Sequence, residues 1–359
     1  MTTHRTTHRT THSTLRRIAT IALATTLGTA LAACSDADST TGDKSSATPT
    51  TRAVDETPNE VTLVAYDAFT PPEGIFDEFT KRTGAKVKVV TGGDSGTVVN
   101  KAILTAGNPE GDVLWGIDNT MLSRAQASNV LHTYEPVDFG DVCVNYSKRW
   151  YGEKKLAPPQ SLDDLIKPEY AGQLVIEDPT NSSPGLAFLL ATIAKYGEGT
   201  WQSYWQKLAP NGVKIAPDWT TAWTIEYAGA GNPGKYPLVV SYGSSPPAEL
   251  VYATDPSAID FPDSGVVEGT CFRQTEYVGV LHGAKNPHLA RALVDYLLGT
   301  TFQSAMPTSL FVWPVLPEAQ IPDVFTRYAV KAKTPLTLEP ERIQKNLTAW
   351  LETWRGIAL

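Results

Sequence analysis

The sequence predicts an α/β protein whose body folds as two lobes. Beyond residue 60, short apolar runs alternate with segments of helical periodicity, the pattern of strands joined by helical crossovers. The chain has 359 residues, more than one hydrophobic core usually serves. A long insertion in the middle of the alternation indicates that the chain leaves one lobe, builds a second and returns. We expect it to cross between the lobes near 138–146 and 266–278.

The elements are expected in the following order, with lobe 1 over 61–142, lobe 2 over 143–270 and a return to lobe 1 over 271–359. Strands are predicted at 61–65, 85–90, 112–117, 139–146, 174–177, 213–216, 238–241 and 275–281. Helices are predicted at 72–84, 97–106, 121–127, 162–166, 185–196, 201–208, 220–228, 287–298, 301–305 and 342–354. Strands separated by helices imply parallel pairing through right-handed crossovers.

The N-terminus is typical of a bacterial lipoprotein signal. Four arginines precede an apolar, small-residue stretch over 18–30, and the stretch ends in Leu-Ala-Ala-Cys at 31–34. This ending resembles a lipobox, in which Cys34 takes a diacylglyceryl group and becomes the new N-terminus after cleavage. The alternative is an ordinary secretory peptide over 1–33 with a chance cysteine. Residues 34–60 are rich in Ser, Thr, Asp and Pro, which predicts a flexible linker between the lipid and the body.

The charge of the chain argues against nucleic-acid binding, and its cysteines predict a disulfide. The formal charge is −8, and beyond residue 33 the chain has 26 basic against 38 acidic side chains, or −12. This balance gives no sign of a surface that binds nucleic acid. Outside the cytoplasm oxidation is permitted, so we predict a disulfide between Cys143 and Cys271. Two separate buried thiols are the alternative.

Three places share one design, in which a strand is followed by a short Ser/Gly turn and then a helix. The turns lie at 91–96, 178–185 and 241–246. Helix N-termini expose unpaired N–H groups, and ligands of open α/β sheets bind beyond the carboxyl ends of strands. Any one of these serines is explained by capping of its own helix. Three such turns distributed over two lobes favour a shared cleft.

Aromatic and acidic residues lie close to these turns. Tyr66 and Asp67 end the first strand, Trp219 follows an aspartate, and Tyr242 lies inside the third turn. Aromatic faces with a carboxylate suit a flat, positively charged ring. The structural alternative for each ring is core packing, which we expect for Trp223 and for the set at 201–205.

Enzyme signals are weak. The string at 93–96, GDSG, matches the start of a serine-protease motif, but it lies between a strand and a helix, and the processed chain has no histidine before His132. The body contains no HExxH, no P-loop and no GxGxxG after a strand. We therefore expect a binding protein without catalytic residues or metal, and keep a secreted serine hydrolase as the competing class.

From about 61 to 357 the chain resembles the thiamine-binding proteins of bacterial ABC importers, which have the two-lobed type II periplasmic-binding-protein fold. The resemblance rests on strings in the same order: YDAF at 66–69, DVLWGIDN at 112–119, PPQSL at 158–162, DP at 178–179 with SPGL at 183–186, SY at 241–242 with SP at 245–246, FQSAMPT at 302–308 and WPV at 313–315. It implies a ligand cleft between the lobes. The adjacent tyrosine pair of iron-binding relatives is missing.

The resemblance also implies roles for individual residues. Tyr66 would stack on the ligand, Trp219 would cover a ring, and Asp67 lies beside them. The remaining positions it points to are Asp94 and Ser95 in the first turn, Ser182 and Ser183 in the second, and Tyr242, Gly243, Ser244 and Ser245 in the third. The ligand would be thiamine or a thiamine phosphate, with another organic cation such as a polyamine as the alternative. The expected protein is a monomeric lipoprotein on the extracytoplasmic face of the membrane, without a cofactor, that passes its ligand to an ABC permease and its ATPase.

Overall fold

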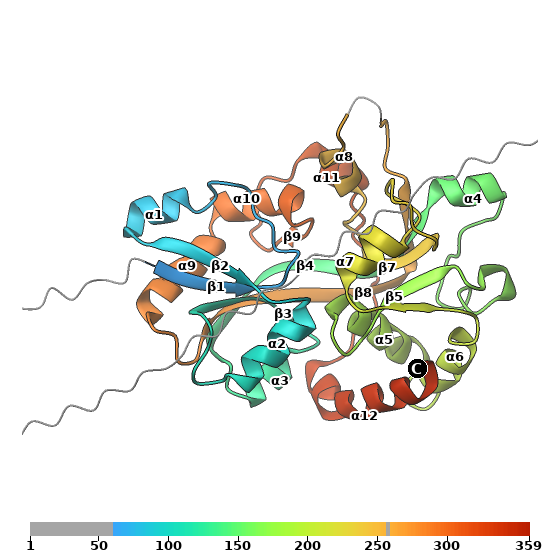
Figure 1. Cartoon of the computed structure of the whole chain (residues 1–359), viewed down its shortest axis with the longest axis horizontal. Coiled ribbons are helices and arrows are strands. Elements are labelled where there is room, and N and C mark those ends of the chain that lie inside the picture. The colour runs from blue at the N-terminus through green and yellow to red at the C-terminus, as the bar shows by residue number, and fades with distance from the viewer. Residues whose placement is uncertain (1–59, 256–258) are drawn as a thin grey trace, which may run out of the picture. The chain divides into compact units, whose positions relative to one another are not determined.

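The computed structural model describes residues 60–255 and 259–359 (Figure 1). The predicted signal peptide, Cys34 and all of the predicted linker except its last residue lie outside the described residues. Within them, no helix combines the length and the hydropathy needed to cross a bilayer.

Strands and helices alternate along the first half of the body, as the sequence predicted. The strands are β1 (Glu60–Ala65), β2 (Lys86–Thr91), β3 (Val113–Asp118), β4 (Leu131–Ser147), β5 (Leu174–Glu177), β6 (Lys214–Ala216), β7 (Leu238–Tyr242), β8 (Ser264–Leu281) and β9 (Trp313–Pro314). The helices are α1 (Asp77–Thr83), α2 (Ser95–Leu104), α3 (Leu122–Ala127), α4 (Lys148–Lys154), the 3-10 helix η1 (Pro168–Tyr170), α5 (Ser183–Tyr196), α6 (Trp201–Leu208), α7 (Trp219–Thr221), the π-helix η2 (Ala222–Glu226), α8 (Pro247–Val251), α9 (Pro287–Leu297), α10 (Thr300–Ser309), α11 (Asp323–Tyr328) and α12 (Pro340–Ala358).

One mixed sheet runs through the body in the order β2-β1-β3-β8-β4-β7-β5-β6, with β9 paired to β4. Parallel pairing holds for β1 with β2 and β3, and for β5 with β6 and β7. The prediction of parallel pairing was wrong for β4 and β8, which pair antiparallel with each other and with β7 and β3. The reason is that these two strands carry the chain from one half of the sheet to the other, in opposite directions.

The β4–β8 ribbon connects the two halves of the sheet. Its register runs from Leu131 opposite Leu281 to Ser147 opposite Ser264. One end of the ribbon lies beside β3 and the other beside β7. Both strands are longer than the sequence predicted, because polar residues inside them interrupt the apolar pattern. The middle of the ribbon, around 138–141 and 273–276, therefore belongs to both halves.

Two hydrophobic clusters cover the opposite faces of the sheet. One involves α1, α9 and α10, and the other involves α2, α3, α5, α6 and α12, which lie on opposite sides of the sheet in Figure 1. Helix α12 contacts both α3 and α6, and Trp354 packs edge-on against Trp205. The last helix thus touches segments expected in each lobe, and the lobe boundaries themselves stay a prediction.

Two local expectations differ from the structure. Residues 162–166 form hydrogen-bonded turns and no helix, followed by η1. The helix predicted at 220–228 is a short α7 continued by the wider π-helix η2.

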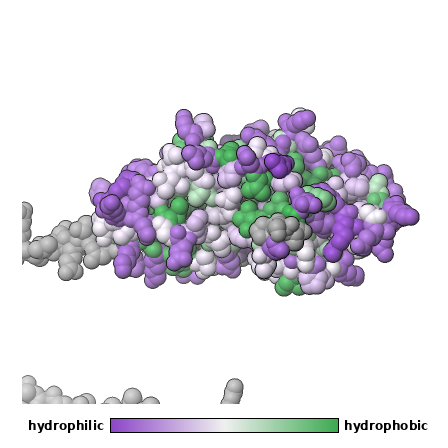
Figure 2. Space-filling model, turned by 90° about the horizontal axis from the view of Figure 1, so that it is seen from above, coloured by the Kyte–Doolittle hydropathy of each residue, from purple (hydrophilic) through white to green (hydrophobic). Residues whose placement is uncertain are grey.

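The visible surface in Figure 2 is mostly hydrophilic, with apolar residues gathered toward its middle. Large side chains that the structure exposes near α8 include Tyr252 and Phe261, at 64% and 62% of their area. Tyr252 packs edge-on against Phe311.

Candidate functional site

The first turn ends at helix α2 and is organised by two aspartates. Asp94 is the N-cap residue of α2, and its Oδ1 accepts a hydrogen bond of 2.7 Å from the Ser95 N–H. Asp67 is exposed, and its carboxylate accepts the Gly93 N–H at 3.0 Å. Ser95 is buried in the first turn of the helix. The first turn therefore presents a carboxylate at a helix N-terminus.

The second turn ends at helix α5, where Pro184 occupies the first helical turn, a position that suits proline. Ser182 occupies the N-cap position of the helix and is buried, but its side chain makes no capping hydrogen bond and instead lies beside the Asp94 carboxylate. The Ser183 hydroxyl donates to the Asp118 carboxylate at the end of β3. Gln274 donates to both groups, at 2.6 Å to Ser183 and 2.8 Å to Asp118. These contacts attach the second turn to the middle of the sheet.

The first and second turns touch each other and reach Trp219. Gly96 lies so close to the second turn that a Cβ placed on it would be 2.4 Å from the Asn181 carbonyl oxygen. The Trp219 N–H donates to Asp94 Oδ2 at 3.1 Å, across 125 residues of sequence. Its indole N–H donates to Ser241 Oγ at 2.9 Å. Trp219 therefore joins the first turn to the third.

The third turn is tied to the β4–β8 ribbon. Ser245 Oγ hydrogen-bonds Ser241 Oγ at 2.9 Å and accepts the Tyr242 N–H at 3.2 Å. The Gly243 N–H donates to the Asp141 carbonyl at 2.7 Å. Ser244 is fully buried with no hydrogen-bond partner for its hydroxyl among the described residues. Its hydroxyl is the buried polar group of the third turn that the described residues leave unpaired.

Tyr66 and Tyr242 approach one carboxylate from opposite halves of the sheet. The Tyr66 hydroxyl donates to Glu276 Oε2 at 3.2 Å. The Tyr242 ring lies against Gly140, where an added Cβ would be 3.0 Å from it. Burial, and next the charge of Glu276, raises the pKa of both phenols well above the usual range, so both stay protonated.

Trp223, expected in the core, is buried and stacks on Trp219 with ring centroids 6.0 Å apart. The structure thus brings the three turns, Trp219 and both tyrosines into one connected region. Among the predicted site residues, Asp67 is the exposed one, and its carboxylate accepts a hydrogen bond from the Gly93 N–H of the first turn.

Sequence reasoning missed a row of acids at the centre of this region. Asp118 on β3 lies directly opposite Glu276 on β8, and Glu276 lies directly opposite Asp138 on β4. We call these three side chains the acidic ladder. They are 0%, 3% and 1% exposed. The signal in the sequence was an acid at the end of, or inside, a strand that is otherwise buried.

The acidic ladder has no basic partner in the part of the chain that the structure describes. None of the ion pairs among the described residues involves it, and both carboxylate oxygens of Asp138 lack a hydrogen-bond partner there. Burial raises the pKa of Asp118, and it raises the pKa values of Asp138 and Glu276 well above the usual carboxyl range. Across 60–255 and 259–359, no cluster of His, Cys, Asp and Glu is arranged to hold a metal ion. The arrangement suits an organic cation.

Glu177 is a further buried acid near the second turn. It is fully buried, and both carboxylate oxygens lack hydrogen-bond partners among the described residues. Burial raises the pKa of Glu177, and the charges of Asp94 and Asp218 raise it further.

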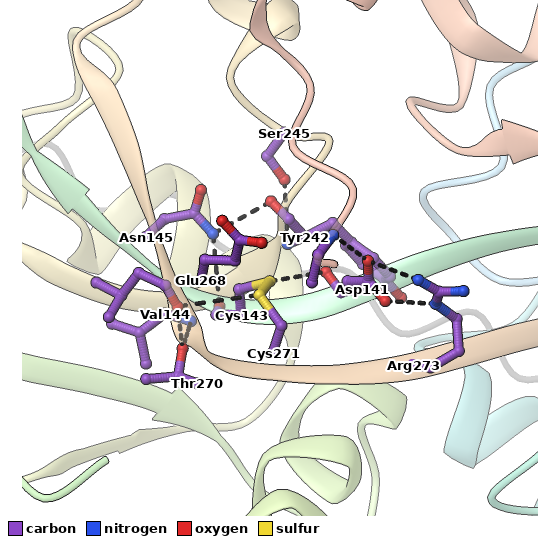
Figure 3. Close-up of a disulfide and its surroundings, with 12 residues drawn as sticks. Asp141, Cys143, Val144, Asn145, Tyr242, Ser245, Glu268, Thr270, Cys271 and Arg273 are labelled. Carbon is purple, nitrogen blue, oxygen red and sulfur yellow. Dashed lines mark hydrogen bonds and ion pairs between the residues drawn. A yellow bond between two sulfur atoms is a disulfide. The ribbon is translucent and has the colours of Figure 1, made fainter. Parts of the chain in front are cut away.

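A disulfide joins the two strands of the ribbon beside this region. Figure 3 shows the bond between Cys143 on β4 and Cys271 on β8, the pair that the sequence predicted. It lies where the register shifts between Val142 and Val144. The Arg273 guanidinium donates to the Asp141 carboxylate next to it, at 2.5 Å and 3.1 Å.

Comparison with known proteins decides the family. Residues 113–337 match the model of a family described as bacterial extracellular solute-binding proteins. The chain belongs to this family. The expectation of a receptor without catalytic function agrees with the proteins it resembles, which are named as binding proteins.

Individual relatives of this solute-binding protein match over nearly their full length. A "Thiamine-binding periplasmic protein" of Salmonella typhimurium is 26% identical over 317 residues, which cover 82% of this chain and 92% of the relative. A protein of the same name from Brucella suis is 27% identical, covering 82% and 90%. A solved structure titled "Periplasmic thiamin binding protein" matches with a TM-score of 0.75 at 23% identity, covering 85% of this chain and 98% of that one. This structural match confirms the predicted type II fold.

Proposed function

We propose that this protein is a lipid-anchored extracytoplasmic receptor that captures thiamine or its phosphates and delivers the ligand to an ABC importer. The observation that carries the proposal is the match of most of the chain to relatives named for thiamine binding. The site is consistent with it, because thiamine has a flat, permanently cationic thiazolium ring joined to an aminopyrimidine. Stacked aromatic rings and unpaired carboxylates recognise such a cation.

In the proposed mechanism the ligand binds between the two halves of the sheet and stabilises their contact. Turns from both halves already meet through Asp94 and Trp219. The β4–β8 ribbon connects the halves and is the natural hinge. A ligand that contacts both halves favours the closed arrangement by its differential affinity for it. The ordered sequence is capture, closure, and docking on the permease.

Calorimetric titration tests the ligand class. We expect saturable binding of thiamine, with its monophosphate and diphosphate ranked in the same experiment and spermidine as the competing cation. Binding of spermidine without binding of thiamine would replace the proposal by a polyamine receptor. Absence of heat with all four ligands would remove the cation-receptor proposal.

Replacing Trp219 by alanine is expected to weaken thiamine binding more than about tenfold, or about 1.4 kcal/mol, because it removes the aromatic ring and the indole hydrogen bond to Ser241. The backbone N–H of residue 219 still donates to Asp94 in this variant. Thiamine should also quench the tryptophan fluorescence of the wild type. Trp150→Ala is the matched control, because Trp150 is also half-buried but lies in α4 beside Tyr151. Equal affinity of Trp219→Ala and wild type would exclude Trp219 from the site.

The anchor is tested separately from the ligand. Cys34→Ala is expected to move the protein from the membrane fraction to the soluble fraction of the bacterium, because Cys34 is the residue proposed to carry the lipid. Its thiamine affinity should equal that of the wild-type body. If wild type and variant are both cleaved and both found in the soluble fraction, the signal is an ordinary secretory peptide.

A further inference from the structure

The acidic ladder places three carboxyl groups at directly opposite positions on three neighbouring strands. Asp118, Glu276 and Asp138 are cross-strand partners, so their side chains project from one face of the sheet. Like charges directly opposite each other are destabilising, and burial of an unpaired carboxylate costs free energy as well. A fold that keeps three such groups side by side needs something to offset this cost.

Within 60–255 and 259–359, no basic side chain forms an ion pair with the acidic ladder. The neighbouring cation, Arg273, pairs with Asp141. Both residues lie an odd number of positions from Glu276 and Asp138 along regularly paired strands, so they project from the opposite face of the sheet. What faces the ladder is a set of tyrosine hydroxyls and further carboxylates. The titratable groups that interact electrostatically with Glu276 are Asp138, Asp118, Tyr66, Asp94 and Tyr242.

A second observation concerns hydrogen-bond acceptors beside the acidic ladder that lack a donor. Gln274 lies two residues from Glu276 on the same face of β8, and its amide donates to Asp118 and Ser183. Its Oε1 atom is buried without a hydrogen-bond partner among the described residues, as are both oxygens of Asp138. All of these atoms are acceptors. The described residues therefore leave these acceptors without donors and the ladder without positive charge, both of which a ligand would bring.

We propose that Glu276 and Asp138 are the counter-charge for the ligand's cationic group, and that they make the site select a flat organic cation over a neutral molecule of the same shape. This inference rests on the proposed function and names the residues that determine its specificity. The tyrosines act with them, because Tyr66 orients Glu276 through its hydroxyl while Tyr242 closes the region from the other half of the sheet.

The protonation of the acidic ladder predicts a pH dependence of stability and of ligand affinity. Burial raises the pKa values of Glu276 and Asp138, so without ligand they retain protons that an unfolded chain has lost above about pH 4. The native state then binds more protons than the unfolded state, and stability of the unliganded protein falls as pH rises through the raised pKa values. A bound cation favours the ionised carboxylates, so binding releases protons and affinity rises with pH over the same range.

The test compares wild type with Glu276→Gln and Asp138→Asn, which keep the shape of each side chain. Two ligands are titrated by calorimetry: thiamine, and its neutral isostere with carbon in place of the quaternary ring nitrogen. Wild type should prefer thiamine, and each variant should lose about tenfold or more of that preference. Glu135→Gln is the matched control, since Glu135 is an exposed acid on the same strand β4, and it should keep the wild-type preference.

Proton release is measured on the wild type in two buffers of different ionisation enthalpy, so this result does not depend on a variant that folds. Release of protons on thiamine binding is expected, with less release in Glu276→Gln. The inference is overturned if the variants keep the wild-type preference, or if wild type binds thiamine without proton release and with the same affinity as the isostere. Failure of wild type to bind thiamine at all would instead overturn the proposed function, and the same variants would then be compared for spermidine; failure to bind either cation would overturn both.

Discussion

Loss of the disulfide is expected to lower the free energy of unfolding by about 2–5 kcal/mol, measured with the double variant Cys143→Ala, Cys271→Ala in urea. The bond joins residues separated by 128 positions, so it restricts a long loop of the unfolded chain. Both cysteines are also buried, in a small cluster with Ala332. The bond joins β4 to β8, the two strands that carry the chain between the halves of the sheet.

Reduced wild type separates the bond from the packing of its sulfur atoms, because it retains both side chains. We expect reduced wild type to unfold at a lower urea concentration than oxidised wild type. The double variant should unfold at the same urea concentration with and without reductant. Mass spectrometry without reductant should find the two cysteine peptides joined. Free thiols, or an unfolding midpoint that reductant leaves unchanged, would contradict this account.

Local signals in the sequence were sufficient for most of the elements and for the turns. Asp94 caps α2 with its carboxylate, and Pro184 fits the first turn of α5; both preferences depend on the next few residues alone. The disulfide pairing followed from the compartment and from having two candidates in the body. Each of these inferences uses information that is close in sequence or independent of the fold.

The acidic ladder could not be predicted in this way. Asp118 and Glu276 are 158 positions apart, and they meet because β8 returns antiparallel between β3 and β4. The polar residues that break the apolar pattern of β4 and β8 also hid the length of both strands, and with it the ribbon. Register decides which face a side chain occupies, and register between distant strands is a property of the whole sheet. Contact between Gly96 and Asn181 was hidden for the same reason.

Replacing Gly96 by alanine is expected to weaken thiamine binding roughly 5- to 150-fold, corresponding to roughly 1–3 kcal/mol of overpacking. The added methyl group would lie 2.4 Å from the Asn181 carbonyl oxygen and 2.7 Å from its carbon, so the first and second turns could no longer approach as they do. The open arrangement that the proposed mechanism requires before capture would separate the two turns and remove this clash.

The effect should therefore appear in binding and leave the unliganded fold intact. Thermal unfolding without ligand should change little or rise in Gly96→Ala, whereas the thiamine dissociation constant increases. Gly152→Ala is the matched control, because Gly152 lies in α4 and an added Cβ there meets nothing within 4 Å. It should bind thiamine as wild type does. If Gly96→Ala binds as tightly as this control, close contact between the two turns is not part of ligand capture, since a bound state that needs the contact must lose affinity when the contact is blocked.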